Sequence, residues 1–138
     1  MTIRQACDSD VPELMRIRAS VRENVLSDPA KVPASLVCEF IRHSGIWLWE
    51  EHGAVLGFTA ADTRDGTIWA LFVDPIAEGR GIARALLPKA LDDLRTQGWG
   101  QARLTTECGS RAEDFYRRFG WRDDGLSPTG ERIFLLDL

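Results

Sequence analysis

The hydrophobic residues change their spacing about a third of the way along the chain. At 11–23 and 33–43 they recur every three to four residues, whereas at 46–51, 54–62 and 67–74 they tend to alternate with polar ones. A helix repeats its face about every 3.6 residues and a strand about every two. The pattern therefore predicts two helices followed by a meander of three antiparallel strands.

The second half of the chain alternates helices and strands. Its predicted elements are a helix at 81–97, a strand at 102–106, a helix that begins after Ser110 and ends at Gly120, and strands at 121–125 and 131–138, and a short strand at 2–6 opens the chain. This order predicts an α+β fold (mixed α/β). Its core is a central twisted, mostly antiparallel sheet of about seven strands, with about four helices on both faces.

Polar residues and one proline add detail at the helices. Asp10 and Glu13 have the spacing of a capping pair at the first helix, and Ser110 and Glu113 have it at the last. Pro88 falls inside the helix at 81–97, where it should free a carbonyl group and bend or delay the helix.

Length and charge limit the classes of protein that the chain can belong to. With 138 residues, of which 44% are hydrophobic, it fits a single domain spanning 1–138. The formal net charge of −4 gives no broad basic surface, so neither nucleic acid nor an anionic membrane is an expected partner. The first ten residues lack a signal-peptide core, and no apolar run approaches the roughly 18 residues of a membrane helix. We therefore expect a cytoplasmic protein.

The cysteines and histidines show no pattern of chemistry. Cys7, Cys38 and Cys108 are widely separated and lack CxxC spacing, so we expect three ordinary thiols and neither a disulfide framework nor a metal site. His43 and His52 lie near a helix end and a turn, without partners at metal-ligand or triad spacing.

The loop at Glu78 to Leu86, EGRGIARAL, joins a predicted strand to a predicted helix and contains a glycine pair. Backbone N–H groups converge on an anion at such a helix start. The string lacks the GxxxxGK of a P-loop, and its Gly79-x-Gly81 pair is followed by Arg84 where a dinucleotide fingerprint needs a third glycine. On the loop alone, a plain strand-to-helix connection remains an alternative to an anion site.

Three strings together resemble a known family. LFVDP, then GRGIARALL, and further on AEDFYRRFGW are similar to the GNAT family of N-acetyltransferases. The usual signature of that family is Gln/Arg-x-x-Gly-x-Gly/Ala after the fourth strand, and Tyr-x-x-x-Gly-Phe at a later helix end. Here Glu78 stands where the family usually has Gln or Arg, and Gly109 stands where it often has Asn.

The resemblance implies an acetyl-CoA cosubstrate and no metal. Pyrophosphate would lie on the loop and the pantetheine arm along the fourth strand, with an amide of Phe72 or Val73 polarising the thioester carbonyl. The implied cofactor-binding residues are Leu71, Phe72, Val73, Gly79, Arg80, Gly81, Ile82, Ala83 and Arg84.

The resemblance also implies the catalytic groups. Tyr116 matches the family tyrosine near the departing sulfur, although aromatic residues at helical spacing also form cores. Glu107 and Asp74 are candidates for a base that deprotonates the amine, and both residue types are also common on surfaces or as caps. The acceptor would bind at the end of the first helix, at Arg22, Glu23 and Asn24.

Three function classes follow. The first is an acyltransferase that moves an acetyl group from acetyl-CoA to a primary amine of a small molecule or peptide. Such an enzyme could also pair with a second copy of itself as a homodimer. The second is a non-catalytic acyl-CoA-binding or sensing module, which the residues at Glu78 and Gly109 would permit. The third, a nucleotide-binding oxidoreductase, fits neither the glycine pattern nor the strand order.

Overall fold

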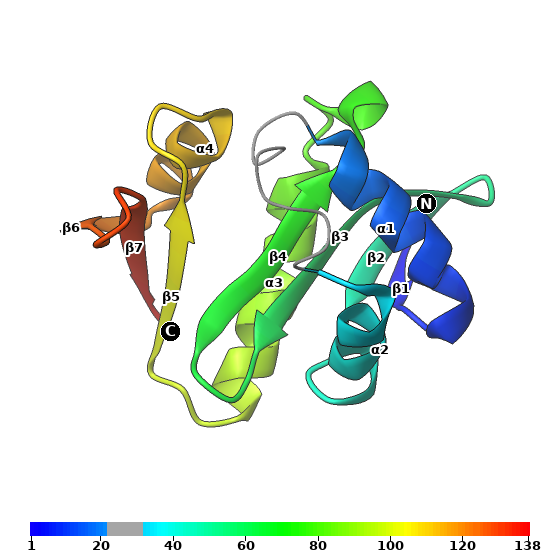
Figure 1. Ribbon diagram of the computed structural model, residues 1–138, viewed down its shortest axis with the longest axis horizontal. Helices are drawn as coiled ribbons and strands as arrows, with labels where there is room; N and C mark the ends of the chain where they lie inside the picture. The colour runs from blue at the N-terminus through cyan, green and yellow to red at the C-terminus, as the bar shows by residue number, and fades with distance from the viewer. Residues whose placement is uncertain (22–31) are drawn as a thin grey trace.

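A computed structural model describes residues 1–21 and 32–138 as one seven-stranded sheet with helices on both faces (Figure 1). The strand order is β1-β2-β3-β4-β5-β7-β6. The strands are β1 (Thr2–Gln5), β2 (Trp47–Glu51), β3 (Ala54–Asp62), β4 (Thr67–Val73), β5 (Gln101–Thr106), β6 (Arg122–Leu126) and β7 (Arg132–Asp137). The helices are α1 (Val11–Ser20), α2 (Ala34–Arg42), α3 (Ile82–Thr96) and α4 (Arg111–Phe119), and short 3-10 turns span Asp8–Asp10 and Pro75–Ala77. The predicted fold class and element order are confirmed.

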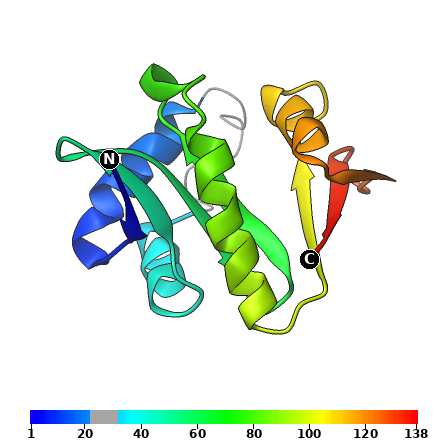
Figure 2. The same cartoon turned by 180° about the vertical axis from the view of Figure 1, so that it is seen from behind.

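The helices form two layers around the sheet. Helices α1 and α2 cover one face of β2, β3 and β4 (Figure 1), whereas α3 and α4 lie on the opposite face (Figure 2). The first layer buries a cluster that includes Leu14, Ile17 and Phe40, and the second buries one that includes Leu87, Leu94 and Phe134. These stripes are the hydrophobic periodicities seen in the sequence, and burying them against the sheet stabilises both layers.

The sheet splits between β4 and β5. All other neighbouring strands pair antiparallel over several residues, whereas these two are parallel and pair only at Thr67↔Arg103. Beyond that pair the strands diverge toward the carboxyl ends of both (Figure 1). The rest of β4, which pairs with β3 on one side, is therefore unpaired along its other edge.

The start of α1 differs from the prediction. Asp10 makes no capping hydrogen bond to α1, because its carboxylate accepts two hydrogen bonds of 2.9 Å from Arg4 and one of 2.8 Å from the Cys7 N–H. The hydrogen bonds from Arg4 lower the pKa of the Asp10 carboxyl to about 2. Glu13 instead pairs with Arg16 at 2.7 Å. The predicted capping pair is therefore wrong, and Asp10 anchors β1 to α1.

Two other features of the helices differ from the prediction. α1 ends at Ser20, because Val21 has an extended backbone, and residues 22 and 23 lie outside the described residues. α3 continues through Pro88 from Ile82 to Thr96, and the predicted delay does not occur. A helix interior loses only one backbone hydrogen bond at proline, and the buried residues of α3 lie on both sides of Pro88.

The cap of α4 is confirmed. The Ser110 Oγ accepts a hydrogen bond of 3.1 Å from the Glu113 N–H. The Glu113 carboxylate accepts one of 2.7 Å from the Gly109 N–H, one residue before the cap. Gly120, in the left-handed conformation, ends the helix as predicted.

Candidate functional site

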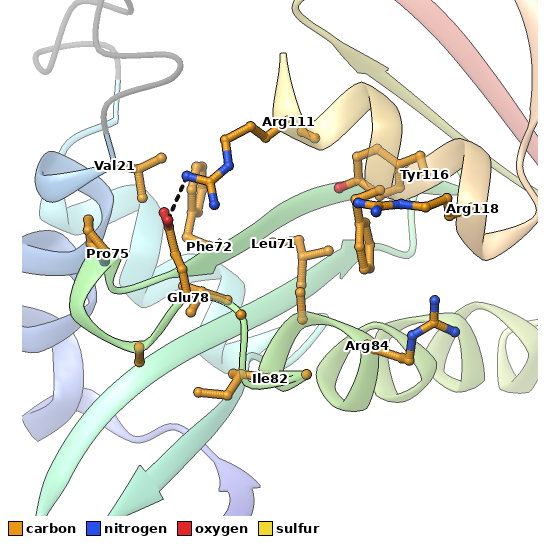
Figure 3. A pocket seen from close by; sticks show the side chains of 17 residues that line it. Val21, Leu71, Phe72, Pro75, Glu78, Ile82, Arg84, Arg111, Tyr116 and Arg118 are labelled. Carbon is orange, nitrogen blue, oxygen red and sulfur yellow. Dashed lines mark hydrogen bonds and ion pairs between the residues drawn. The ribbon is translucent and has the colours of Figure 1, made fainter.

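A cavity of about 920 Å³ lies beside the open edge of β4, between that strand, the start of α3 and α4 (Figure 3). Its walls come from the end of α1, the open part of β4, the connection from β4 to α3, the first turn of α3, and α4. The lining residues are Val21, Leu71, Phe72, Val73, Pro75, Ala77, Glu78, Gly79, Gly81, Ile82, Ala83, Arg84, Arg111, Ala112, Phe115, Tyr116 and Arg118. The volume is within the range of pockets that hold small molecules and cofactors.

The glycine pair shapes the connection from β4 to α3. Gly79 and Gly81 have φ angles of +78° and +81°, which residues with a Cβ rarely adopt. A Cβ at either position would meet no heavy atom within 4 Å, so glycine is required for its backbone conformation and not for close packing. The space beside both residues is open to the cavity.

This conformation leaves a row of backbone donors. Among residues 1–21 and 32–138, no group accepts a hydrogen bond from the N–H groups of residues 79–84, and the first N–H of α3 that is bonded belongs to Ala85, which donates to Gly81 O at 3.1 Å. α3 has no acidic residue in its first turn. Free N–H groups and the helix dipole together attract negative charge. The backbone therefore offers the row of donors that the predicted anion site requires.

A second set of donors lies on the open edge of β4. The Asp74 N–H donates to Leu56 O on β3 at 2.8 Å. Because the N–H groups of a strand alternate between its two sides, the Phe72 N–H also points toward β3, while those of Leu71 and Val73 point toward the split. Of the two amides predicted to polarise a carbonyl group, Val73 has the required direction.

Arginines surround the cavity. Arg84, Arg111 and Arg118 line it and are exposed, and Glu78 is the only acidic residue among the described residues that line it. Glu78 is ion-paired with Arg111 at 2.7 Å, which joins the β4–α3 connection to the first residue of α4 (Figure 3). The cavity wall thus carries a net positive charge that favours an anionic ligand.

Tyr116 is both a core residue and a wall of the cavity. It is only 7% exposed, and its ring contacts Phe115, Trp121 and Phe134 with centroids 5.3, 5.6 and 6.0 Å away. Its hydroxyl group points into the cavity (Figure 3). Burial raises the pKa of the Tyr116 phenol well above its ordinary value, so the group keeps its proton at neutral pH and can donate a hydrogen bond into the cavity.

Neither predicted base lines the cavity. Glu107 is exposed after the end of β5, where its backbone carbonyl accepts a hydrogen bond of 2.6 Å from Ser110. Asp74 is buried, pairs with Arg16 at 2.8 Å and accepts a hydrogen bond from the Ile76 N–H at 3.1 Å. Burial alone would raise the pKa of the Asp74 carboxyl, but these hydrogen bonds outweigh it and the pKa is lowered. Asp74 is therefore a structural cap.

Most predicted cofactor-binding residues line the cavity, with one exception. The side chain of Arg80 turns away from the cavity and pairs with Glu51 on β2 at 2.8 Å. Arg80 therefore contributes its backbone N–H to the row of donors and not its guanidinium. The predicted acceptor residues at 22–24 lie outside the described residues. The sequence interpretation missed Arg111, Phe115 and Arg118, whose spacing of four and three residues places them on one face of α4.

Comparison with known proteins identifies the family. A family model described as the acetyltransferase (GNAT) domain matches residues 29–135. The chain therefore belongs to the GNAT acetyltransferase family, as the sequence motifs indicated.

Individual relatives agree with this assignment. Over 82 residues the chain is 37% identical to a mycothiol acetyltransferase from Beutenbergia cavernae, a match that covers 55% of this chain and 28% of that relative. An N-acetyltransferase from Staphylococcus aureus Mu50 has 21% identity and a TM-score of 0.80, covering 99% of this chain and 97% of that one. The PaiA N-acetyltransferase from Thermoplasma acidophilum, solved in complex with coenzyme A, has 16% identity and a TM-score of 0.82 over 99% and 98% of the two chains. The two structures show the shared fold.

In the described part of the chain, no group of three or more His, Cys, Asp or Glu side chains is arranged to hold a metal ion. None of the described helices is long and apolar enough to cross a membrane.

Proposed function

We propose that this domain is an acetyl-CoA-dependent N-acetyltransferase that acts on a primary amine. The observation that carries the proposal is the cavity at the split sheet, where unbonded N–H groups of residues 79–84 lie at one end and the Tyr116 hydroxyl at the other. Membership of the GNAT family supports the same activity.

The residues present fit acetyl-CoA. The N–H groups of residues 79–84 would hold the pyrophosphate, and Arg84 and Arg118 would add positive charge. The unpaired edge of β4 offers hydrogen bonds from Leu71 and Val73 to the amide groups of the pantetheine arm. The anion is thus bound by backbone and arginine alone.

Bound acetyl-CoA supplies an activated acyl group: its C–S bond breaks as an N–C bond to the amine forms, the amine loses one proton and the CoA thiol gains one. The Val73 N–H would stabilise negative charge on the carbonyl oxygen. Tyr116 would donate a hydrogen bond to the sulfur as it departs. Since an ordinary thiol has a pKa near ~8.5, below that of the phenol, Tyr116 stabilises the thiolate mainly through this hydrogen bond.

The amine also has to lose its proton. Among the described lining residues Glu78 is the only acid, and its carboxylate is already engaged in an ion pair of 2.7 Å with Arg111. A primary amine has a pKa near ~10, so a small neutral fraction exists at pH 7. In this proposal the neutral amine enters from solution, and Glu107 and Asp74 have no part in the proton transfer.

Calorimetric titration tests the proposal directly. The purified domain is titrated with acetyl-CoA and, for comparison, with CoA, NADH and ATP, and free thiol release is then followed across a panel of amines. We expect selective binding of acetyl-CoA and CoA, together with amine-dependent thiol release. Binding without release would favour a non-catalytic acyl-CoA-binding module, and no binding would contradict the proposal.

Replacing Glu78 with glutamine should tighten acetyl-CoA binding by roughly two- to tenfold, as expected for removal of one partly screened like charge. The substitution removes the only carboxylate that the described residues contribute to the cavity wall, and it breaks the 2.7 Å ion pair between Glu78 and Arg111. Calorimetry at low and high salt measures the change, which should shrink as salt screens the charges.

Glu51→Gln is the matched control. Glu51 also pairs with an arginine of the same connection, Arg80 at 2.8 Å, but neither side chain lines the cavity. This variant should bind acetyl-CoA as the unmodified protein does. Equal or weaker binding by Glu78→Gln would mean that the carboxylate helps to shape the cavity and does not oppose the anion.

A further inference from the structure

Helix α1 carries an arginine, Arg18, that has no acidic partner among the described residues. Arg18 is half-buried, and its guanidinium carbon lies 5.3 Å from the centroid of the Phe72 ring. In the described ranges, the arginines that have no acidic partner are Arg18, Arg84, Arg103 and Arg118. The other three are exposed, so Arg18 is the only one of this set that is partly withdrawn from water.

The Arg18 guanidinium is attracted to the face of the Phe72 ring, 5.3 Å from its guanidinium carbon, and keeps its charge. This contact leaves its N–H groups available to an anion. Burial lowers the pKa of Arg18, consistent with the loss of water around it. The neighbouring charges are already satisfied, because Arg16 pairs with Asp74 at 2.8 Å and Glu78 with Arg111 at 2.7 Å. Among residues 1–21 and 32–138, Arg18 is thus a half-buried arginine of α1 that has no acidic partner.

The position of Arg18 relates it to the acceptor and not to the cofactor. Phe72 packs with the α1 and α2 cluster, whereas Leu71 and Val73 pack with residues of α3. The row of N–H donors begins α3, so the acetyl group is delivered from the α3 face. The opposite face, where Arg18 covers Phe72, is left for the amine. Val21, one turn further along the chain, lines the cavity itself.

We propose that Arg18 binds a carboxylate of the acceptor, so that the substrates are amines that also carry a carboxylate group, as amino acids and peptides with a free C-terminus do. The inference rests on the proposed acetyltransferase function. A guanidinium packed over an aromatic ring retains N–H groups for a planar carboxylate, to which it can donate two parallel hydrogen bonds. This contact would hold the amine beside Phe72.

The test compares acceptors that differ only in the carboxylate. Glycine, L-phenylalanine, L-lysine and glycyl-glycine are each assayed beside the corresponding C-terminal amide, with free CoA thiol as the readout, and kcat/KM is compared at matched concentrations of neutral amine. We expect at least one pair to favour the carboxylate by roughly tenfold or more, the size of a charge-assisted hydrogen-bond pair. Arg18→Gln should bring that ratio close to one, and Arg18→Lys should keep part of it.

Two controls separate this inference from the proposed function. Arg18→Gln should bind acetyl-CoA as tightly as the unmodified protein, because Arg18 lies on the opposite face. Arg42→Gln, which removes an exposed arginine paired with Asp8 on the far helix α2, should leave the ratio unchanged. Normal acetyl-CoA binding with turnover that ignores or disfavours the carboxylate would overturn the role of Arg18, whereas loss of acetyl-CoA binding by the unmodified protein would contradict the function itself.

If none of the amines in the panel is acetylated, the binding of product analogues provides the test. The CoA-loaded domain is titrated with N-acetylglycine, N-acetyl-L-phenylalanine and their amides as product probes. Tighter binding of a carboxylate that is lost in Arg18→Gln supports the inference. Binding that is the same for the carboxylate and the amide, or the same in both proteins, contradicts it.

Discussion

Tyr116→Phe is expected to lower kcat by roughly 10- to 100-fold, the loss of one hydrogen bond to a developing charge. Binding of acetyl-CoA should change by no more than about twofold. The hydroxyl group is the only part of the side chain that is removed, and the ring contacts with Phe115, Trp121 and Phe134 can persist. Steady-state rates with thiol detection, beside calorimetric titration, measure the two effects separately.

Trp121→Phe provides the packing control for this experiment. Trp121 contacts the Tyr116 ring at 5.6 Å but does not line the cavity, and its buried indole N–H has no hydrogen-bond partner in the described structure. This variant should lower thermal stability more than it lowers kcat. If Tyr116→Phe kept the full kcat, the hydroxyl would have no part in the reaction and Tyr116 would be a core residue alone.

Hydrophobic spacing predicted the architecture because burial of apolar side chains determines it. Helix α3 buries one stripe of residues, as its period of 3.6 predicts, and β5 alternates exposed and buried residues, whereas β3 is buried on both faces from Val55 to Ala61. The sequence also predicted the loop at Gly81 and the helix end at Gly120, because the positive φ angles at these positions are accessible mainly to glycine.

The sequence did not predict the ion pairs that join separate elements of the fold. Arg80, which stands between two glycines of the anion loop, pairs with Glu51, 29 residues away. Asp10 has the spacing of a cap, but Arg4 holds it, and that arginine also bonds Glu50 from 46 residues along the chain. Such pairs depend on how strands and loops meet, and no local pattern encodes that.

The arginines of α4 share one helix face that can be recognised in the sequence, but the sequence does not show that this face points into the cavity. The spacing of Arg111, Phe115 and Arg118 places them on one face of any helix. Which way that face points depends on the rotation of α4 about its axis, which is fixed by Tyr116 packing against Trp121 and Phe134. The cavity therefore acquires its positive wall only when β7 and the end of α4 come together.

The largest expected effect follows from Gly81→Val, which should weaken acetyl-CoA binding at least about 100-fold. Valine adopts the +81° φ of Gly81 only with strain, so the loop should move and carry the N–H groups of residues 79–84 out of line. The added side chain also occupies open space beside the cavity. Loss of two charge-assisted hydrogen bonds, at roughly 1.5–3 kcal/mol each, gives an effect of this size.

Gly98→Val is the control that separates the loss of acetyl-CoA binding from the loss of stability caused by backbone strain. Gly98 lies just beyond the other end of α3, has a φ of +90°, and likewise offers open space to a Cβ, but it does not line the cavity. Both variants should lose similar thermal stability, because both place valine in the same unfavourable backbone region. Only Gly81→Val should lose acetyl-CoA, measured by calorimetry at a temperature where both are folded. Normal affinity in that variant would mean that the glycine pair is only a connection between β4 and α3, and the anion would then have to be held by Arg84, Arg111 and Arg118.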